Sequence, residues 1–401
     1  MPEDQLQGNE SSGAPSQPAA DPRPVVMSSR PSRRWLWIAG GLALLVVAAG
    51  LTWWFARQSL EKKPAATNQS HPVSGQASSP TEPQIKTEGL ALDTAKQYGD
   101  KYKNGLLPVG DNKYATDGAK KGYIYMCSAN FVPASQAGAQ TRGPWFTNNN
   151  TQWDLTKKVA VKGAVSWQPN ITVKIENGKR VVTTNDLPDH HTGSFPVASS
   201  DPAYAYDRNP NSIQTQSLTY SLAAKPLYGQ PQCMGGEVGV MLSGAALFNG
   251  FDAGGRDAGA WEIQDLCDGH PQSHGEYHYH TLSRCVKDTS VSTVIGYALD
   301  GFPITGPKVG EGNYLTTDDL DECHGIVSLV ILDGKEVTTY HYVMTQDFPY
   351  SASCFRATAI QPPGQSETQG AGAHGGTATQ TGGTGTGTQQ PPPAQPYSPP
   401  R

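Results

Sequence analysis

The sequence reads ITVKIENGKRVVTT from Ile171 to Thr184, and this stretch decides the fold class. Apolar and polar side chains alternate through its first five residues, as a half-buried strand requires. Asn177-Gly178 then supplies the pair of residues that a two-residue hairpin turn prefers, and a second run rich in β-branched residues follows. The stretch therefore predicts a β-hairpin.

Runs of the same kind recur on both sides of this hairpin. They are Val159–Val161, Ala164–Trp167, Gly239–Leu242, Ser292–Tyr297, Ile326–Leu332 and Val337–Tyr342. The last two flank Asp333-Gly334, which predicts a second hairpin. Only Leu90–Tyr98 and Ala258–Cys267 are helix candidates, because Gly and Pro interrupt almost everything else. The pattern predicts a mostly β domain with long loops, either an antiparallel sandwich or a barrel.

A different signal lies upstream of the domain. Residues 35–55 contain no charged side chain, and tryptophans stand at both ends of the run. About 20 apolar residues in a helix span a bilayer core, and indole rings favour its interfaces. The run is longer than the core of a cleaved signal peptide. It predicts one transmembrane helix that acts as an uncleaved signal anchor.

Composition divides the rest of the chain. Residues 1–34 form a polar arm, 56–89 a stalk rich in Pro, Ser and Thr, and 361–401 a tail rich in Gly, Thr and Pro; we expect the arm and the tail to be disordered. Residues 90–360 remain for one globular domain. A formal net charge of −5 without a basic stripe argues against a nucleic-acid partner.

All six cysteines follow the predicted span, which indicates disulfide bonds in an oxidising compartment. We therefore expect the arm to be cytoplasmic and the domain to be periplasmic or extracellular. Six cysteines allow 15 pairings. Among these we expect the local pairs Cys267–Cys285 and Cys323–Cys354, which leave Cys127 with Cys233.

Histidines gather in the stretch from Asp268 to His280, where four of the chain's ten lie within eleven residues. Alternate residues of a strand share a face, so Glu276, His278 and His280 would project together. Such a pair of imidazoles can reach one ion, and the carboxylate can act as a further ligand or orient a ring.

Other histidines are candidates to complete the site. His270 lies on the approach to this strand, and His341 lies in the similar sequence Tyr340-His341-Tyr342. Three histidines suit Zn²⁺ or Cu²⁺. Further candidates are His190, His191, His274 and His324. The alternative is a buried Tyr, His and Asp network that only stabilises the fold.

The motif Tyr277-His278-Tyr279-His280 resembles the one that names the YHYH-domain family. The resemblance runs from Asn185 to Arg356 and includes Gly296–Pro307, Leu320–Gly325 and the closing segment Tyr340–Phe355. Thr305 departs from it, because many relatives have Tyr there. The resemblance implies an extracytoplasmic domain, but it implies no particular reaction.

Three functions therefore remain open. The domain could bind a transition metal through His270, His278, His280 and His341. It could instead be a metal-assisted hydrolase or oxidase, with Glu276 or Asp300 as the acid or base. It could also be a non-catalytic adhesion or envelope-binding module.

Overall fold

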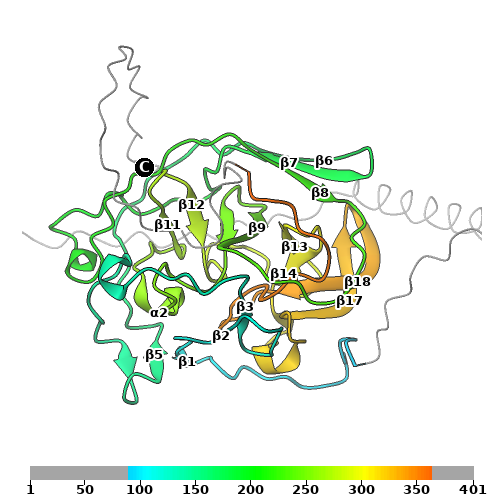
Figure 1. Ribbon diagram of the computed structural model, residues 1–401, viewed down its shortest axis with the longest axis horizontal. Coiled ribbons are helices and arrows are strands. Elements are labelled where there is room, and N and C mark those ends of the chain that lie inside the picture. Colours follow the sequence, from blue (N-terminus) through cyan, green and yellow to red (C-terminus); the bar gives the residue numbers. More distant parts are fainter. Residues whose placement is uncertain (1–88, 364–401) are drawn as a thin grey trace, which may run out of the picture. The chain divides into compact units, whose positions relative to one another are not determined.

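The computed structural model describes residues 89–363 (Figure 1). Its largest element is an eight-stranded sheet with the order β11-β12-β10-β9-β13-β14-β18-β17. The strands are β9 (Glu237–Met241), β10 (Ala246–Phe248), β11 (Gly269–Pro271), β12 (Tyr277–Tyr279), β13 (Val294–Ala298), β14 (Pro303–Thr305), β17 (Gly325–Leu332) and β18 (Lys335–Val343).

This sheet is open and mixed. Its two ends, β11 and β17, do not pair with each other, and the pairs β10–β12 and β14–β18 are parallel. The prediction of a mostly β domain is confirmed. The barrel alternative is wrong for the described residues, and so is a purely antiparallel arrangement. Two parallel strands are joined by a long connection, so no local sequence pattern predicts that they pair.

Both predicted hairpins are present. One joins β6 (Ile171–Glu176) to β7 (Lys179–Thr184), and the other joins β17 to β18. Each turns at two residues with positive φ, which are Asn177-Gly178 and Asp333-Gly334. β8 (Leu218–Ala223) pairs with β7 and completes a three-stranded sheet. Alternate residues of β7 and β8 are buried, as the alternating sequence indicates.

Several expected elements are shorter or absent. Val161 and Val165 form only isolated bridges, so neither run is a strand. Residues 90–98 are not helical, because Leu90 and Leu92 form backbone hydrogen bonds with Val327 of β17. The predicted second helix is reduced to α2 (Ala258–Trp261), since the chain after it turns to pair with Val161.

Small elements pack around the two main sheets. They are β1 (Leu106–Pro108), β5 (Gln152–Asp154) and β4 (Phe146–Thr147) in one sheet, the pairs β2 (Tyr114–Ala115) with β3 (Ile124–Tyr125) and β15 (Lys308–Gly310) with β16 (Asn313–Tyr314), and the 3-10 turns Ala134–Gln136, Pro202–Ala205 and Thr317–Asp319. Within residues 89–363, irregular segments connect most of them, as the frequency of Gly and Pro predicts.

Tyrosines dominate the core, and three disulfides brace it. Tyr277, Tyr279, Tyr340 and Tyr342 are at most 1 % exposed. The disulfides are Cys127–Cys233, Cys267–Cys285 and Cys323–Cys354, which are the pairs expected from the sequence.

The predicted transmembrane helix at residues 35–55 and both terminal segments lie outside the described residues. Within residues 89–363, no helix has the length and apolar character that a membrane crossing needs.

Candidate metal centre

The β11–β12 hairpin brings three buried imidazoles together. His270 pairs directly with His278 across the two strands, and His280 follows two residues later on the same face as His278. One ligand nitrogen from each ring can be chosen so that all three lie within 4.8 Å of one another. The three residues are 3–4 % exposed. The alternation of residues in the sequence therefore predicted correctly that His278 and His280 lie close together.

A carboxylate from another segment points at this cluster. Glu262, the residue after α2, places Oε2 3.2 Å from Nε2 of His280 and 3.5 Å from Nε2 of His270. α2 fixes its position, because Asp257 caps the helix start by accepting from Ala260 N–H at 3.1 Å. The Glu262 N–H donates to the oxygen of Ala258, and the backbone becomes extended at Glu262.

Backbone carbonyls orient two of the rings. Nδ1 of His280 lies 2.6 Å from the backbone oxygen of Asn249, and Nδ1 of His278 lies 3.3 Å from that of Glu276. A carbonyl oxygen only accepts, so Nδ1 is the donor in His278 and in His280. Each neutral ring then carries its lone pair on Nε2, the atom that could bind a metal ion, as in many metal sites with an outer hydrogen bond.

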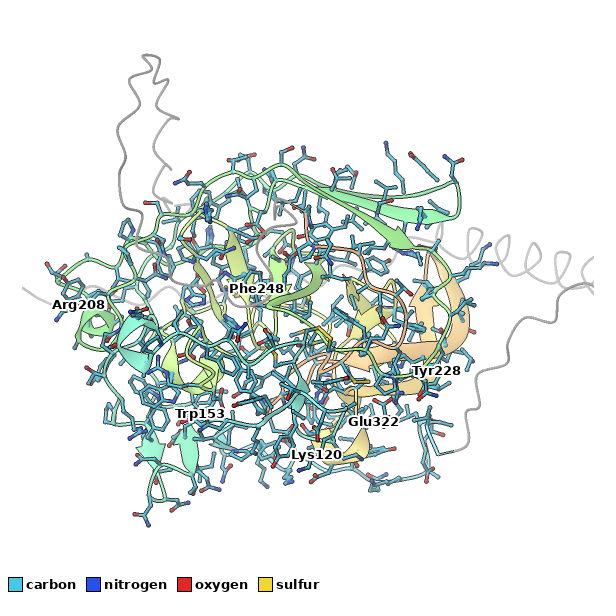
Figure 2. All side chains as sticks on the ribbon, in the orientation of Figure 1. Lys120, Trp153, Arg208, Tyr228, Phe248 and Glu322 are labelled. Atoms are coloured by element: carbon cyan, nitrogen blue, oxygen red, sulfur yellow. A yellow bond between two sulfur atoms is a disulfide. The ribbon has the colours of Figure 1, made fainter. Side chains whose placement is uncertain are left out.

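Phe248 forms an apolar wall of the site. Its ring stacks on His278 with a centroid distance of 4.2 Å and an interplanar angle of 29°. Phe248 is the last residue of β10, which pairs with β12, and it is buried (labelled in Figure 2). Apolar surroundings lower the local dielectric constant and strengthen any charge interaction at the cluster.

Burial makes an isolated carboxylate at Glu262 unfavourable. Loss of hydration raises the pKa of Glu262 well above its usual range, and the nearby carboxylates of Asp252 and Asp207 raise it further. A bound cation would offset this cost. Three imidazoles and one carboxylate could therefore hold a metal ion.

Two of the separations match those of a tetrahedral ligand set, and the three imidazole ligand atoms lie within 4.8 Å of one another. Two ligand atoms about 2.05 Å from one zinc ion at the tetrahedral angle lie about 3.3 Å apart. The two distances from Glu262 to the histidines, 3.2 and 3.5 Å, bracket this value.

His341 is not part of the cluster. It lies on β18, with β10, β9, β13 and β14 between that strand and β12. Its two ring nitrogens lie 3.0 Å from Thr305 Oγ1 and 2.8 Å from Ser328 Oγ. Burial lowers the pKa of His341 to about 4, so the ring is neutral at pH 7. Of the four predicted metal ligands, the structure brings together His270, His278 and His280.

The two predicted acid or base residues lie elsewhere. The Glu276 carboxylate accepts from the Gln272 side chain. Burial raises the pKa values of Asp186 and Glu237 well above their usual range, and the nearby Glu276 raises them further. Asp300 accepts from Tyr342 Oη at 2.7 Å and from backbone N–H groups of the closing segment. Burial raises the pKa of Asp300 to about 6. Asp300 therefore ties the turn between β13 and β14 to β18 and to the backbone at Arg356 and Ala357.

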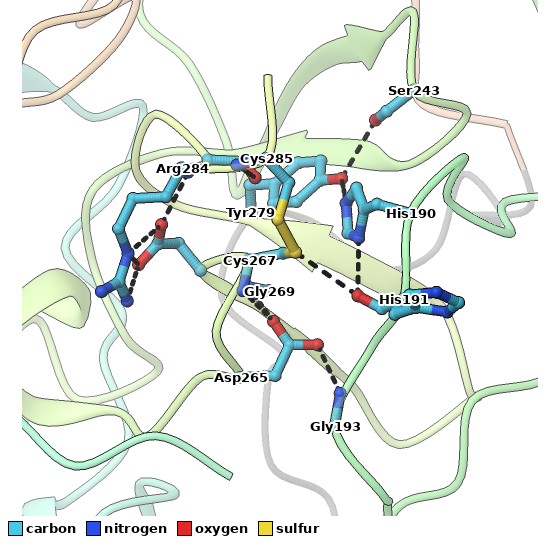
Figure 3. The surroundings of a disulfide bond; sticks show 12 residues. His190, His191, Gly193, Ser243, Asp265, Cys267, Gly269, Tyr279, Arg284 and Cys285 are labelled. Carbon is cyan, nitrogen blue, oxygen red and sulfur yellow. Dashed lines mark hydrogen bonds and ion pairs between the residues drawn. A yellow bond between two sulfur atoms is a disulfide. The ribbon is translucent and has the colours of Figure 1, made fainter. Parts of the chain in front are cut away.

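Other candidate histidines of the described residues lie outside the cluster. His190 Nε2 lies 2.6 Å from Tyr279 Oη, close to the Cys267–Cys285 disulfide (Figure 3). The metal ligand form of cysteine is the thiolate, so a disulfide does not bind a metal there. His324 lies 3.0 Å from Thr345 Oγ1, and His274 is exposed.

Sequence reasoning missed Glu262. The residue comes from a separate segment and belongs to no periodic pattern. The one available signal was its place in the middle of the helix candidate Ala258–Cys267, three residues before Asp265. That signal does not indicate which way the side chain points.

Comparison with known proteins agrees with the resemblance seen in the sequence. Residues 219–313 match a family model described as YHYH protein. Neither a curated protein nor a solved structure matches the chain. The matched region runs from β8 to β16 and includes Glu262 and all three clustered histidines. Residues 219–313 are therefore similar to the YHYH family over the part of the chain that holds the cluster.

Proposed function

We propose that this YHYH-like domain binds one transition-metal ion through Nε2 of His278 and His280, a ring nitrogen of His270, and the Glu262 carboxylate. The observation that carries the proposal is the convergence of three buried imidazoles and one buried carboxylate from two separate segments. Buried groups of this kind are usually paired or bound to a metal.

Zinc is the ion that we propose. Zn²⁺ takes nitrogen and oxygen ligands in a tetrahedral set, and a four-ligand site without water is typical of structural zinc. Copper(II) binds such donors more tightly but prefers a tetragonal arrangement. The three clustered imidazoles, two of them beside the Glu262 carboxylate, favour a metal that stabilises the β11–β12 hairpin. No candidate acid or base from the sequence lies against the cluster, so a catalytic role has no specific support.

We also propose that the domain stands on the non-cytoplasmic side of a membrane, held by residues 35–55. The uncharged run flanked by tryptophans supports the anchor. The pairing of all six cysteines into disulfides supports an oxidising compartment.

The direct test is the metal content of the purified full chain after incubation with Zn²⁺ or Cu²⁺ and removal of free metal. We expect about one zinc per chain from elemental analysis. His278→Gln should reduce bound zinc at least tenfold, because it removes a ligand while keeping a polar side chain of similar size.

His341→Gln is the matched control. It changes a buried histidine of the same sheet that lies in the same Tyr-His-Tyr sequence, and it should leave the zinc content unchanged. The proposal fails if the wild-type chain retains neither metal. It also fails if the two variants lose zinc equally.

A further inference from the structure

We infer that the eight-stranded sheet consists of two copies of one four-stranded unit, and that only the first copy carries a metal site. The first unit is β9, β10, β11 and β12, and the second is β13, β14, β17 and β18. The statement about metal rests on the proposed function, whereas the repeat does not depend on a bound metal.

The order of the strands is the first observation. The order β11-β12-β10-β9-β13-β14-β18-β17 lists the first unit and then the second in reverse (Figure 1). In each unit the first two strands pair antiparallel, the second pairs parallel with the fourth, and the third and fourth form an antiparallel hairpin. Two identical connection patterns therefore meet at β9 and β13.

The register of the pairs gives the same correspondence. The sequence VGVMLSGAALF from Val238 to Phe248 aligns without gaps with IGYALDGFPIT from Ile295 to Thr305. Val240 pairs with its own counterpart, Tyr297, at the centre of the sheet. In the alignment Gly239 corresponds to Gly296, and Met241 corresponds to Ala298. Gly239 pairs with Ala298 and Met241 pairs with Gly296, so a twofold rotation exchanges the two pairs.

The parallel pairs also correspond. Leu247 lies opposite Tyr279 in the first unit, and Ile304 lies opposite Tyr342 in the second. This step aligns Tyr277-His278-Tyr279 with Tyr340-His341-Tyr342.

The loop before each third strand repeats the same hydrogen bonds. The sequences are DLCDGH from Asp265 and DECHGI from Asp321. Each leading aspartate accepts from the N–H of the cysteine two residues later, from the glycine N–H and from the hydroxyl of the first tyrosine of the Tyr-His-Tyr strand. The donors are Cys267, Gly269 and Tyr277 in the first unit, and Cys323, Gly325 and Tyr340 in the second.

The two loops also share an uncommon backbone conformation. The residue before each glycine has positive φ, 63° at Asp268 and 70° at His324, a conformation that non-glycine residues adopt infrequently. A side chain at Gly269 would overlap Tyr277, and one at Gly325 would overlap Tyr340. In both loops a glycine leaves room for the ring of the first tyrosine of the Tyr-His-Tyr strand, and the residue before it has positive φ.

The ligand positions differ between the units. The counterparts of His270, His278 and His280 are Ile326, His341 and Val343. Ile326 and Val343 belong to an apolar cluster with Val291, Leu315 and Leu320. By its place three residues before the leading aspartate, Glu262 corresponds to Asp318, which is largely exposed and pairs with Lys101. The second unit thus keeps one of the four ligands and packs apolar side chains where the first has histidines.

The test exchanges the side chains of one unit for those of the other in the full chain. His270→Ile and His280→Val, combined with Glu262→Gln, give the first unit the residues that already surround His341. The matched control carries His270→Ala and His280→Ala with the same Glu262→Gln. Melting temperatures are measured by circular dichroism in EDTA, so that the order of the three proteins does not depend on metal.

We expect the Ile/Val variant to melt no lower than the metal-free wild-type chain and several degrees above the Ala control. An Ile/Val variant that melts at or below the Ala control, or that does not fold, would overturn the inference. Failure of the proposed function would show differently, as absence of metal from the wild-type chain.

Discussion

At the scale of single residues, His278 and His341 occupy corresponding positions but have different surroundings. His278 lies among two other imidazoles and a carboxylate reaches that cluster, whereas His341 lies between two hydroxyl groups. A sequence pattern records the residue type and its spacing, and both are the same in the two strands. Only the neighbours brought in by other segments separate a candidate ligand from a structural residue.

The depressed pKa of His341 predicts a pH-dependent stability. Burial lowers this pKa from an ordinary value of 6.5 to about 4. The contribution of the neutral ring is therefore complete above pH 6.5 and is lost as the pH falls towards 4. A shift of this size corresponds to roughly 3 kcal/mol of unfolding free energy.

His341→Gln should accordingly destabilise the chain most at pH 7. The difference in unfolding free energy between the wild-type chain and the variant should shrink by roughly 3 kcal/mol between pH 7 and pH 4. Urea denaturation at several pH values, in EDTA, measures this difference. A difference that stayed constant with pH would contradict the burial of a neutral ring.

The candidate site shows what a sequence can predict at this scale. His270, His278 and His280 were predictable because a hairpin places nearby residues on one face. Glu262 was not, since its direction depends on where α2 ends. His341 satisfied the local pattern, but four strands separate its strand from β12, and that separation is set by the order of the sheet.

At the scale of elements, the Cys267–Cys285 disulfide closes a loop that contains all three clustered histidines. Its separation of 18 residues is much shorter than the 106 residues of Cys127–Cys233. In the chain-entropy model a short loop stabilises by about 3 kcal/mol and a long one by nearly 5 kcal/mol. Loss of Cys127–Cys233 should therefore reduce stability more, whereas loss of Cys267–Cys285 should reduce metal binding more.

Cys267→Ser with Cys285→Ser should weaken zinc binding at least tenfold, because the strand ends that hold the ligands are no longer joined. Cys127→Ser with Cys233→Ser should reduce the melting temperature more but leave zinc affinity within twofold. Competition with a fluorescent zinc chelator measures the affinities. Equal affinities in the two double variants would show that the disulfide does not support the site.

The hairpins were predictable from sequence because alternation and turn residues are local. β6–β7 and β17–β18 follow that rule, and their Asn-Gly and Asp-Gly turns stand at the expected positions. The parallel pairs β10–β12 and β14–β18 were not predictable, because their partners are separated by long loops. The run at Leu90–Leu92 was read as a helix start, yet its backbone bonds go to β17.

At the scale of the whole molecule, the proposed anchor makes a prediction about location. The full chain should sediment with membranes, and a chain lacking residues 35–55 should not. Protease added outside intact cells or spheroplasts should degrade the domain, because we place it on the non-cytoplasmic side. Immunoblotting with an antibody to residues 89–363 gives the readout. Protection of the domain until the membrane is opened would reverse the proposed orientation.

The attachment of Leu90 and Leu92 to β17 determines how the domain would respond to mechanical tension from its N-terminal side. Force would first detach this short segment and then extend the chain as far as Cys127, which is about 130 Å of backbone. Beyond that point the Cys127–Cys233 bond carries the load directly to the start of β9. The hairpin β6–β7 and strand β8, which lie between the two cysteines in sequence, would bear no tension.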